Sequence, residues 1–400
     1  MTKSDLRLPT SPKGLIETPE SLAEVCTHLR AAGRFGFDTE FIGETSYRPI
    51  LCLIQVSTDE RVELIDPMTL KDLAPFWELL ADPAIEKICH AGDQDLAIAW
   101  QLGRVASKNV FDCQIGGGFV GFGYPVAYWR LVEECSGVAL EKAHTFSAWD
   151  RRPLTRSQFT YAVDDVAYLP TIHRMLRDQM AALNHTHWMR EACDELCIKA
   201  STDSDPRLAF GRIKSAGSLD PVQLSVLREL ALLREQISYE HDVPARSMFK
   251  DEALLDIAQR MPEELPRLLA IRSVPKEEVA TYGGELLAAI KRGKALPAEQ
   301  RPYLPPPIDD SMEVKRLAEM MYAASQVICL GQSVSPSLVT SQAEILALAR
   351  RMHAQKDLAK HPLMSGWARE CLGEPLTKFA RGETKLGLRM TIERMHLDTQ

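Results

Sequence analysis

Two acidic residues, Asp38 and Glu40, lie two positions apart in the apolar stretch Phe35-Gly-Phe-Asp-Thr-Glu-Phe41. Residues two apart project from the same face of a β-strand, so both carboxylates are expected to point to one place. Like charges held this close raise each other's pKa unless something positive lies between them. A divalent cation is the obvious candidate, while an acidic surface strand is the alternative that this stretch by itself leaves open.

Three further side chains turn this strand into a candidate site. Asp95 lies in the first turn of a helix predicted over residues 93–102, where backbone N–H groups favour negative charge. One of the two aspartates there, Asp93 or Asp95, is expected to be simply the helix N-cap. Tyr161 and Asp165 are four apart on a predicted helix and therefore share one of its faces.

The elements expected to position these residues form a mixed sheet with helices. A helix that begins after Thr18 and stops at Gly33 precedes the acidic strand, and a capping box at Thr155 opens a long helical stretch. Alternating apolar residues and turn signals predict the other elements. They are strands at 48–57, 61–66, 85–90 and 110–112 and helices at 73–80, 93–102, 128–135 and 155–199. This order favours an α/β domain whose sheet combines an antiparallel meander with parallel strands.

The composition changes to helix only after a polar, turn-rich segment at 201–206. We therefore expect an α/β domain over 1–200, a helical domain over 212–294, a proline-rich linker over 295–311 and a second helical domain over 312–390. A glycine cluster at 116–123 lacks the spacing of a dinucleotide-binding loop and indicates close helix packing instead.

Charge and composition exclude some classes of protein. The net charge of −8 does not indicate a nucleic-acid-binding protein. An acidic metal site can nevertheless coexist with a basic surface elsewhere on the same chain. The sequence shows neither a signal peptide nor a run of about 20 apolar residues, so we expect a cytoplasmic protein without a membrane segment. Nine cysteines with no C-x-x-C pair favour buried thiols over disulfides or a zinc site.

The acidic motifs resemble those of a known family. Asp38-Thr-Glu40, His90-Ala-Gly-x-x-Asp95-Leu and Tyr161-x-x-x-Asp165 look like the three exonuclease motifs of the ribonuclease D family, in the tyrosine-bearing branch of the DEDD 3′ to 5′ exonucleases. Residues 227–287 are similar to the HRDC helical domain that this family shares with RecQ-type helicases, and 366–376 to a more degenerate second copy. The resemblance implies an α/β plus all-α protein, with an RNase H-like mixed-sheet exonuclease domain followed by two small HRDC-type domains.

The resemblance also implies roles for individual residues. Tyr161 would hold the attacking water. The metal ligands would be four carboxylates, those of Asp38, Glu40, Asp95 and Asp165. Two divalent cations about 3.5–4 Å apart can supply the nucleophile, the charge stabilisation and the leaving-group assistance that phosphodiester hydrolysis needs. Oxygen ligands indicate Mg²⁺ or Mn²⁺. The sequence departs from the family at Ala148, where an Asp before Trp149 is usual.

The expected substrate is RNA with a single-stranded 3′ end, with tRNA precursors as the class that the resemblance implies, and the expected products are nucleoside 5′-monophosphates. The chain is expected to act as a monomer. Candidate substrate contacts are Thr39, Phe41, Gln55 and His90. Each has a structural alternative, since Phe41 could belong to the core, Gln55 could cap the sheet and His90 could be a satisfied structural histidine. A DNA or mixed-substrate exonuclease and a catalytically inactive nucleic-acid-binding protein remain the alternative functions.

Overall fold

The computed structural model describes residues 8–140, 148–203, 205–304, 310–390 and 395–399. Its contacts divide the chain into two compact units. The first contains Met1–Phe41, Leu51–Ser201 and Asp310–Gln400, and the second contains Ile42–Ile50 and Thr202–Asp309. The domain bounds given above remain predictions, and residues 305–309 of the expected proline-rich linker lie outside the described residues.

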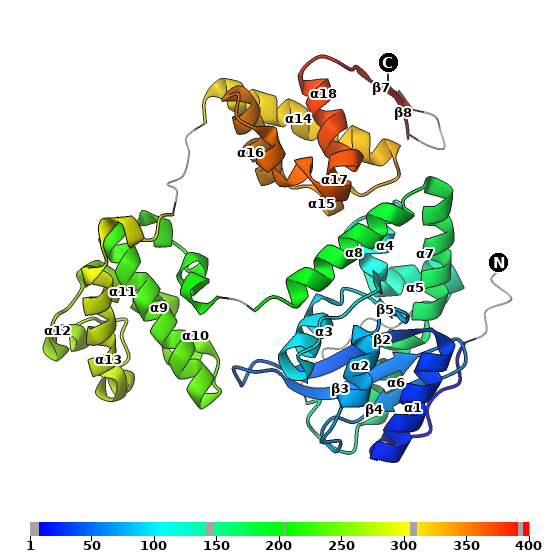
Figure 1. Cartoon of the computed structure of the whole chain (residues 1–400), viewed down its shortest axis with the longest axis horizontal. Helices are drawn as coiled ribbons and strands as arrows, with labels where there is room; N and C mark the ends of the chain where they lie inside the picture. The colour runs from blue at the N-terminus through cyan, green and yellow to red at the C-terminus, as the bar shows by residue number, and fades with distance from the viewer. Residues whose placement is uncertain (1–7, 141–147, 204, 305–309, 391–394, 400) are drawn as a thin grey trace. The chain divides into compact units, whose positions relative to one another are not determined.

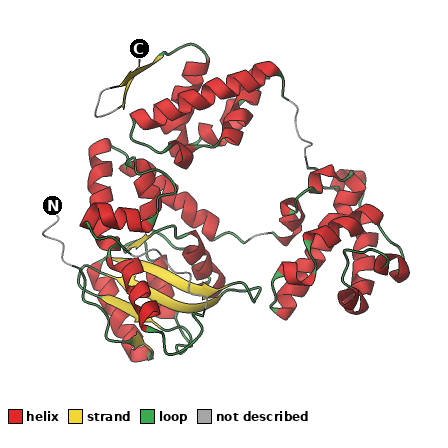
Figure 2. Cartoon of the chain, turned by 180° about the vertical axis from the view of Figure 1, so that it is seen from behind, coloured by secondary structure: helices red, strands yellow, loops and turns green. Residues whose placement is uncertain are grey.

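A six-stranded sheet in the order β1-β4-β3-β2-β5-β6 forms the centre of the first unit (Figures 1 and 2). Its strands are β1 Leu15–Ile16, β2 Arg34–Ile42, β3 Ile50–Ser57, β4 Val62–Ile65, β5 Glu86–Cys89 and β6 Val110–Asp112. The pairs β2–β5 and β5–β6 are parallel, whereas β3–β4 is antiparallel. The predicted mixed sheet is therefore confirmed.

One strand of this sheet, β1, was not predicted from the sequence. The sequence pattern predicts no strand before the first helix, but Leu15 and Ile16 pair in parallel with Leu64 and Ile65 of β4. Two apolar residues are too few to show the alternation by which strands are recognised, so only the tertiary pairing reveals β1.

Eight α-helices of the first unit precede residue 201 in the described part of the chain. They are α1 Pro19–Ala32, α2 Ala74–Ala81, α3 Asp93–Ile98, α4 Cys113–Phe119, α5 Tyr128–Ser136, α6 Arg156–Ala167, α7 Leu169–Leu183 and α8 Thr186–Ala200. The Thr18 hydroxyl caps α1, which ends at Gly33 with a φ of 71°. The capping box of Thr155 and Gln158 opens α6 as the sequence predicts. These side chains satisfy backbone groups that a helix end leaves unpaired.

Strand β2 is buried because helices cover both of its faces. Phe35 and Phe37 belong to a core cluster with residues of α1 and α2, and the rings of Phe35 and Phe76 lie 6.3 Å apart. Burial of each such ring contributes about 2 kcal/mol to folding. Gly36 points the other way, and a Cβ there would lie 2.9 Å from Cβ of Leu169 in α7. The acidic residues that follow on the Gly36 face therefore project toward α6 and α7.

The C-terminal helices pack within the same unit as the sheet. They are α14 Met312–Gly331, α15 Pro336–Val339, α16 Gln342–His353, α17 Gly366–Ala368 and α18 Glu374–Ala380, followed by the antiparallel strands β7 Leu386–Met390 and β8 Met395–Thr399. These strands were not expected, because the sequence predicts a helical domain over 312–390 and no strand after it. Trp367 joins the helices to the α/β part, because its indole N–H donates to Glu195 (3.3 Å) and its ring lies 5.1 Å from that of Phe119.

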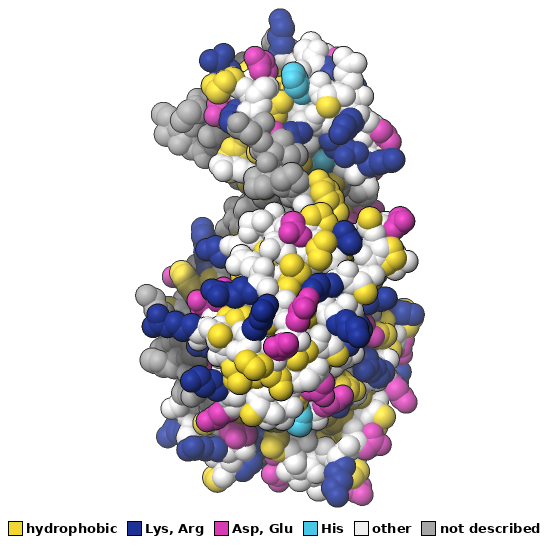
Figure 3. Space-filling view, turned by 90° about the vertical axis from the view of Figure 1, so that its left-hand side faces the viewer, with side chains coloured by type: hydrophobic (Ala, Val, Ile, Leu, Met, Phe, Trp, Pro, Cys, Tyr) yellow, Lys and Arg dark blue, Asp and Glu magenta, His cyan; other side chains and the backbone are white. Residues whose placement is uncertain are grey.

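The second unit is helical, as predicted, and has its own core. Its helices are α9 Pro221–His241, α10 Ala245–Met248, α11 Asp251–Arg260, α12 Leu265–Leu269 and α13 Lys276–Ala295. Leu227, Leu254 and Leu286 are fully buried at its centre. Lys and Arg side chains lie interspersed with Asp and Glu over the face that Figure 3 shows. Among the described residues, no helix is long and apolar enough to cross a membrane.

A buried ion pair holds the end of β4. Arg152 donates to both carboxylate oxygens of Asp66 (2.8 Å each), whose side chain is fully buried. Arg152→Ala leaves this buried carboxylate with hydrogen bonds from Met68 and Thr69 but without its positive partner. We therefore expect the free energy of unfolding to fall by about 3 kcal/mol, measured by urea denaturation. Arg30→Ala breaks the exposed pair with Asp82 and is the matched control, with a much smaller loss expected because solvent screens this pair. Equal losses in the two variants would contradict this role of Asp66.

Candidate active site

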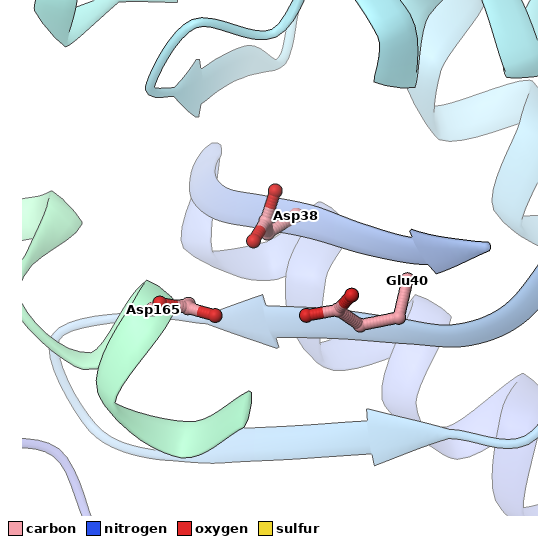
Figure 4. A group of neighbouring side chains, drawn as sticks. All are labelled: Asp38, Glu40 and Asp165. Carbon is pink, nitrogen blue, oxygen red and sulfur yellow. The ribbon is translucent and has the colours of Figure 1, made fainter. Parts of the chain in front are cut away.

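Three of the four predicted carboxylates converge between β2 and α6 (Figure 4). One oxygen from each of Asp38, Glu40 and Asp165 lies within 4.8 Å of the other two. In Figure 4 the carboxylates of Glu40 and Asp165 turn toward each other from the strand and the neighbouring helix. The alternation of β2 and the position of Asp165 on α6 thus bring together residues that are far apart in the sequence.

Asp95 reaches the site from a different direction. It is buried in the first turn of α3, and the Thr39 hydroxyl donates a hydrogen bond to its carboxylate. The N-cap of α3 is Gly92, so the expectation that one of Asp93 and Asp95 serves as the cap is wrong. Asp95 is therefore free of a capping role and interacts electrostatically with Asp38, whose pKa its charge raises.

Tyr161 shares the inner face of α6 with Asp165. Its hydroxyl is close enough to the Asp165 carboxylate for the charge of this group to add to the effect of burial in raising the pKa of Tyr161, and its ring lies 6.1 Å from that of the buried Trp149. Together with β2 they border a cavity of about 180 Å³, lined by Phe37, Asp38, His90, Tyr128, Tyr161, Asp165 and Leu169. The cavity is thus lined by both carboxylates and aromatic rings.

Burial makes the ionised forms of these groups costly. It raises the pKa of Glu40 to about 8, of Asp165 to about 7 and of Asp95 to about 6, and the charges of neighbouring carboxylates add to the effect at Glu40 and Asp165. The pKa of Asp38 is raised well above its usual range for the same two reasons. Burial also raises the pKa of Tyr161, so its hydroxyl stays protonated at neutral pH.

This donor set fits divalent cations. All the converging groups offer oxygen, which hard cations such as Mg²⁺ and Mn²⁺ prefer. One oxygen of Asp165, Oδ2, is buried without a hydrogen-bond partner, as expected of an atom that a cation would satisfy. A positive charge between the carboxylates would also remove the repulsion that raises their pKa values.

The four candidate substrate contacts lie in different surroundings. Thr39 faces Asp95 and is buried, and Phe41 is partly buried against the core cluster. Gln55 is fully buried, and its amide nitrogen and oxygen have no hydrogen-bond partner. His90 lines the cavity, with an unpartnered Nδ1 and with its ring 5.4 Å from that of Tyr128. Of the four, His90 alone lines the carboxylate cavity.

Sequence reasoning missed Asp112, which organises the loop before Asp95. Its carboxylate accepts hydrogen bonds from the backbone N–H of Ala91 (3.2 Å) and Gly92 (2.9 Å). It also caps α4 by accepting from the N–H of Gln114 (2.7 Å) and Ile115 (3.3 Å). An Asp between a strand and a helix is an ordinary N-cap signal, but its second role depends on the parallel pairing of β5 with β6 and is invisible in the sequence.

Comparison with known proteins identifies the family. A 3′-5′ exonuclease family model matches residues 14–181 and an HRDC domain model matches residues 223–290. Ribonuclease D of Nitrobacter hamburgensis is 30% identical over 94% of this chain and 97% of its own, and that of Granulibacter bethesdensis is 32% identical over 94% of each. The chain belongs to the ribonuclease D family.

A solved structure agrees with this family assignment. The crystal structure of Escherichia coli ribonuclease D matches with a TM-score of 0.82 and 28% identity, covering 93% of this chain and 99% of that one. The predicted family and fold class are thereby confirmed, with an exonuclease domain followed by an HRDC helical region. The enzyme class, a metal-dependent 3′ to 5′ exoribonuclease of the ribonuclease D type, is confirmed as well.

The raised pKa values predict how cation binding depends on pH. A carboxyl whose pKa is raised by folding stabilises the folded state below its unfolded pKa of about 4, and this stability is lost as the pH rises through the folded values. The metal-free protein should therefore lose stability between pH 5 and pH 8, where Asp95, Asp165 and Glu40 ionise. Cations bind the ionised form, so 5 mM Mg²⁺ should raise the melting temperature relative to EDTA by at least about 3 °C more at pH 8 than at pH 6. Equal increases at both pH values would contradict this coupling.

The two roles of Asp112 can be separated by Asp112→Asn. The amide oxygen can keep the three N–H contacts of Oδ1, whereas the amide NH₂ cannot accept from Gly92. We expect a melting temperature within a few degrees of the wild type but a loss of exonuclease turnover of about tenfold or more, with a higher Mg²⁺ concentration at half-maximal activity. The control is Asp220→Asn. Asp220 caps its own helix α9 through the N–H groups of Val222 and Gln223, and it is far from the site in sequence. Loss of stability without a change in Mg²⁺ dependence would show that Asp112 only caps α4.

Proposed function

We propose that Asp38, Glu40, Asp95, Asp165 and Tyr161 form the two-cation catalytic site of this exoribonuclease. The substrate would be RNA with a single-stranded 3′ end, including tRNA precursors, and the products nucleoside 5′-monophosphates. The observation that supports the proposal most directly is the convergence of three carboxylate oxygens within 4.8 Å at the edge of a cavity.

Each side chain would have a distinct task. Asp38, Glu40 and Asp165 would hold one cation, and Asp95, whose charge acts on Asp38, would help to hold the second. When bound, Mg²⁺ or Mn²⁺ supplies a water of lowered pKa and stabilises charge on the phosphate. Tyr161 stays protonated because burial raises its pKa, so its hydroxyl would orient the attacking water rather than take its proton.

His90 and Tyr128 would enclose the reacting end of the RNA. Both rings line the cavity, and burial lowers the pKa of His90, so this histidine is neutral at pH 7. A neutral imidazole can accept or donate a hydrogen bond without adding charge beside the cations. The unpartnered Nδ1 of His90 is therefore suited to contact a polar group of the terminal nucleotide.

The substrate class rests on the relatives. Escherichia coli ribonuclease D is described as an exoribonuclease involved in structured RNA processing. The 28% identity of this chain to that protein extends over 93% of its length, so the helical domains are shared as well as the catalytic part. We infer that these domains hold the structured body of the RNA while its single-stranded 3′ tail enters the cavity.

Two substitutions test the site. Asp38→Ala should lower turnover on RNA by more than about 10³-fold while leaving the melting temperature at or above the wild-type value, because it removes one of several repelling buried charges. Tyr161→Phe should lower turnover by about 10²-fold with RNA affinity largely unchanged. Asp93→Ala, which changes an exposed carboxylate beside Asp95, is the matched control and should keep wild-type activity. Near-normal turnover by folded Asp38→Ala protein would overturn the proposed site.

The substrate is tested with a structured RNA that carries a 3′ tail, incubated with Mg²⁺ or Mn²⁺ and resolved on a gel. We expect stepwise shortening from the 3′ end, release of 5′-monophosphates and a stop near the base of the stem. A DNA oligomer of the same sequence should be shortened more slowly. Faster digestion of the DNA would favour a DNA or mixed-substrate exonuclease instead.

A further inference from the structure

The glycine cluster of α4 has close neighbours on two sides. A Cβ at Gly117 would lie 2.7 Å from Cγ1 of Val126, in the loop that follows the helix. A Cβ at Gly118 would lie 2.9 Å from Cδ2 of Leu338, in α15 of the C-terminal helical part. Consecutive residues on a helix point about 100° apart, so two adjacent glycines allow two different segments to approach α4 closely. The predicted close packing is therefore confirmed, and it joins the C-terminal helices to the loop at 120–127.

Hydrogen bonds fix the same contact. The backbone N–H of Ser335 donates to the carbonyl of Gly118 (2.7 Å), and the Ser337 hydroxyl donates to the carbonyl of Tyr124 (2.5 Å). Ser335 is buried and Leu338 rests on Gly118. We call residues 335–338 the docking segment. It holds α4 and the loop at 120–127 through three contacts, two of them polar and one apolar.

The other end of this loop leads into the catalytic cavity. The ring of Tyr128 lies 5.4 Å from that of His90, and the Val126 carbonyl accepts a hydrogen bond from the Gln114 side chain (3.2 Å). Two residues later, Tyr128 lines the cavity, and its hydroxyl donates to the carbonyl of Asp164 (3.0 Å), immediately before Asp165. The loop therefore contacts the docking segment at Tyr124 and positions His90 and Tyr128 at its far end.

We propose that the docking segment of the C-terminal helical part positions His90 and Tyr128 in the catalytic cavity, so that this part of the chain supports turnover itself as well as contact with the body of the RNA. The inference rests on the proposed catalytic site. Ser337 and Leu338 act as positioning residues, because they contact the loop and its supporting helix and touch neither the carboxylates nor the cavity.

A diribonucleotide separates this proposal from a purely RNA-gripping role, because it lacks the structured body that the helical domains are proposed to hold. The double variant Ser337→Ala with Leu338→Ala removes both side-chain contacts of the docking segment with the loop and α4. We expect its kcat on the diribonucleotide with Mg²⁺ to fall about tenfold and the backbone amides of residues 122–128 to exchange hydrogen at least about tenfold faster. Leu338→Met, which conserves the side-chain volume, should keep wild-type values of both.

The matched control is Ser341→Ala. It removes the N-cap of α16, whose hydroxyl accepts from the N–H of Glu344 (3.3 Å), in the same helical part but without contact to the loop. It should change neither kcat on the diribonucleotide nor exchange at 122–128. Unchanged kcat or unchanged exchange in the folded double variant would overturn the proposal. Hydrogen exchange is measured without catalysis. A wild-type protein that failed to cleave RNA would therefore refute the proposed function, whereas the exchange result would still decide whether the docking segment holds the loop.

Discussion

Folding of the first unit gathers several carboxylates into one partly buried cluster, and this costs free energy. Raised pKa values at Asp38, Glu40, Asp95 and Asp165 show that folding holds these groups together against their own repulsion and desolvation. The free energy for this arrangement must come from the apolar contacts and hydrogen bonds around it. Such local frustration is expected at a site that a cation completes.

The surrounding contacts are arranged to hold each carboxylate from a separate element. Phe35 and Phe37 anchor β2 in the core, so the acidic residues on its other face cannot turn outward. Asp112 fixes the loop that precedes Asp95. Tyr128 ties the backbone before Asp165 to α5. The rigidity of the site therefore depends on how these three separate segments pack. The C-terminal helices contribute to this packing, because they hold α4 and the loop at 120–127.

Sequence reasoning could predict what depends on local pattern. The alternation of β2, the capping box at Thr155 and the four-residue spacing of Tyr161 and Asp165 all act over a few residues, and the structure reproduces each of them. The features that sequence reasoning could not predict depend on pairing between distant segments. The short strand β1 exists through its partner β4, and the second role of Asp112 exists through the parallel pairing of β5 and β6. Likewise, the glycines of α4 show only that something packs closely, whereas the structure shows that α15 does.

The central claim is that the converging carboxylates hold two catalytic cations. The most direct measurement is a crystal structure of the protein soaked with Mn²⁺ and a nucleoside 5′-monophosphate, with the manganese located by anomalous scattering. Two manganese peaks about 3.5–4 Å apart are expected, in contact with Asp38, Glu40, Asp95 and Asp165. A site that binds the nucleotide but shows no manganese at these carboxylates, or manganese only elsewhere on the protein, would contradict this claim.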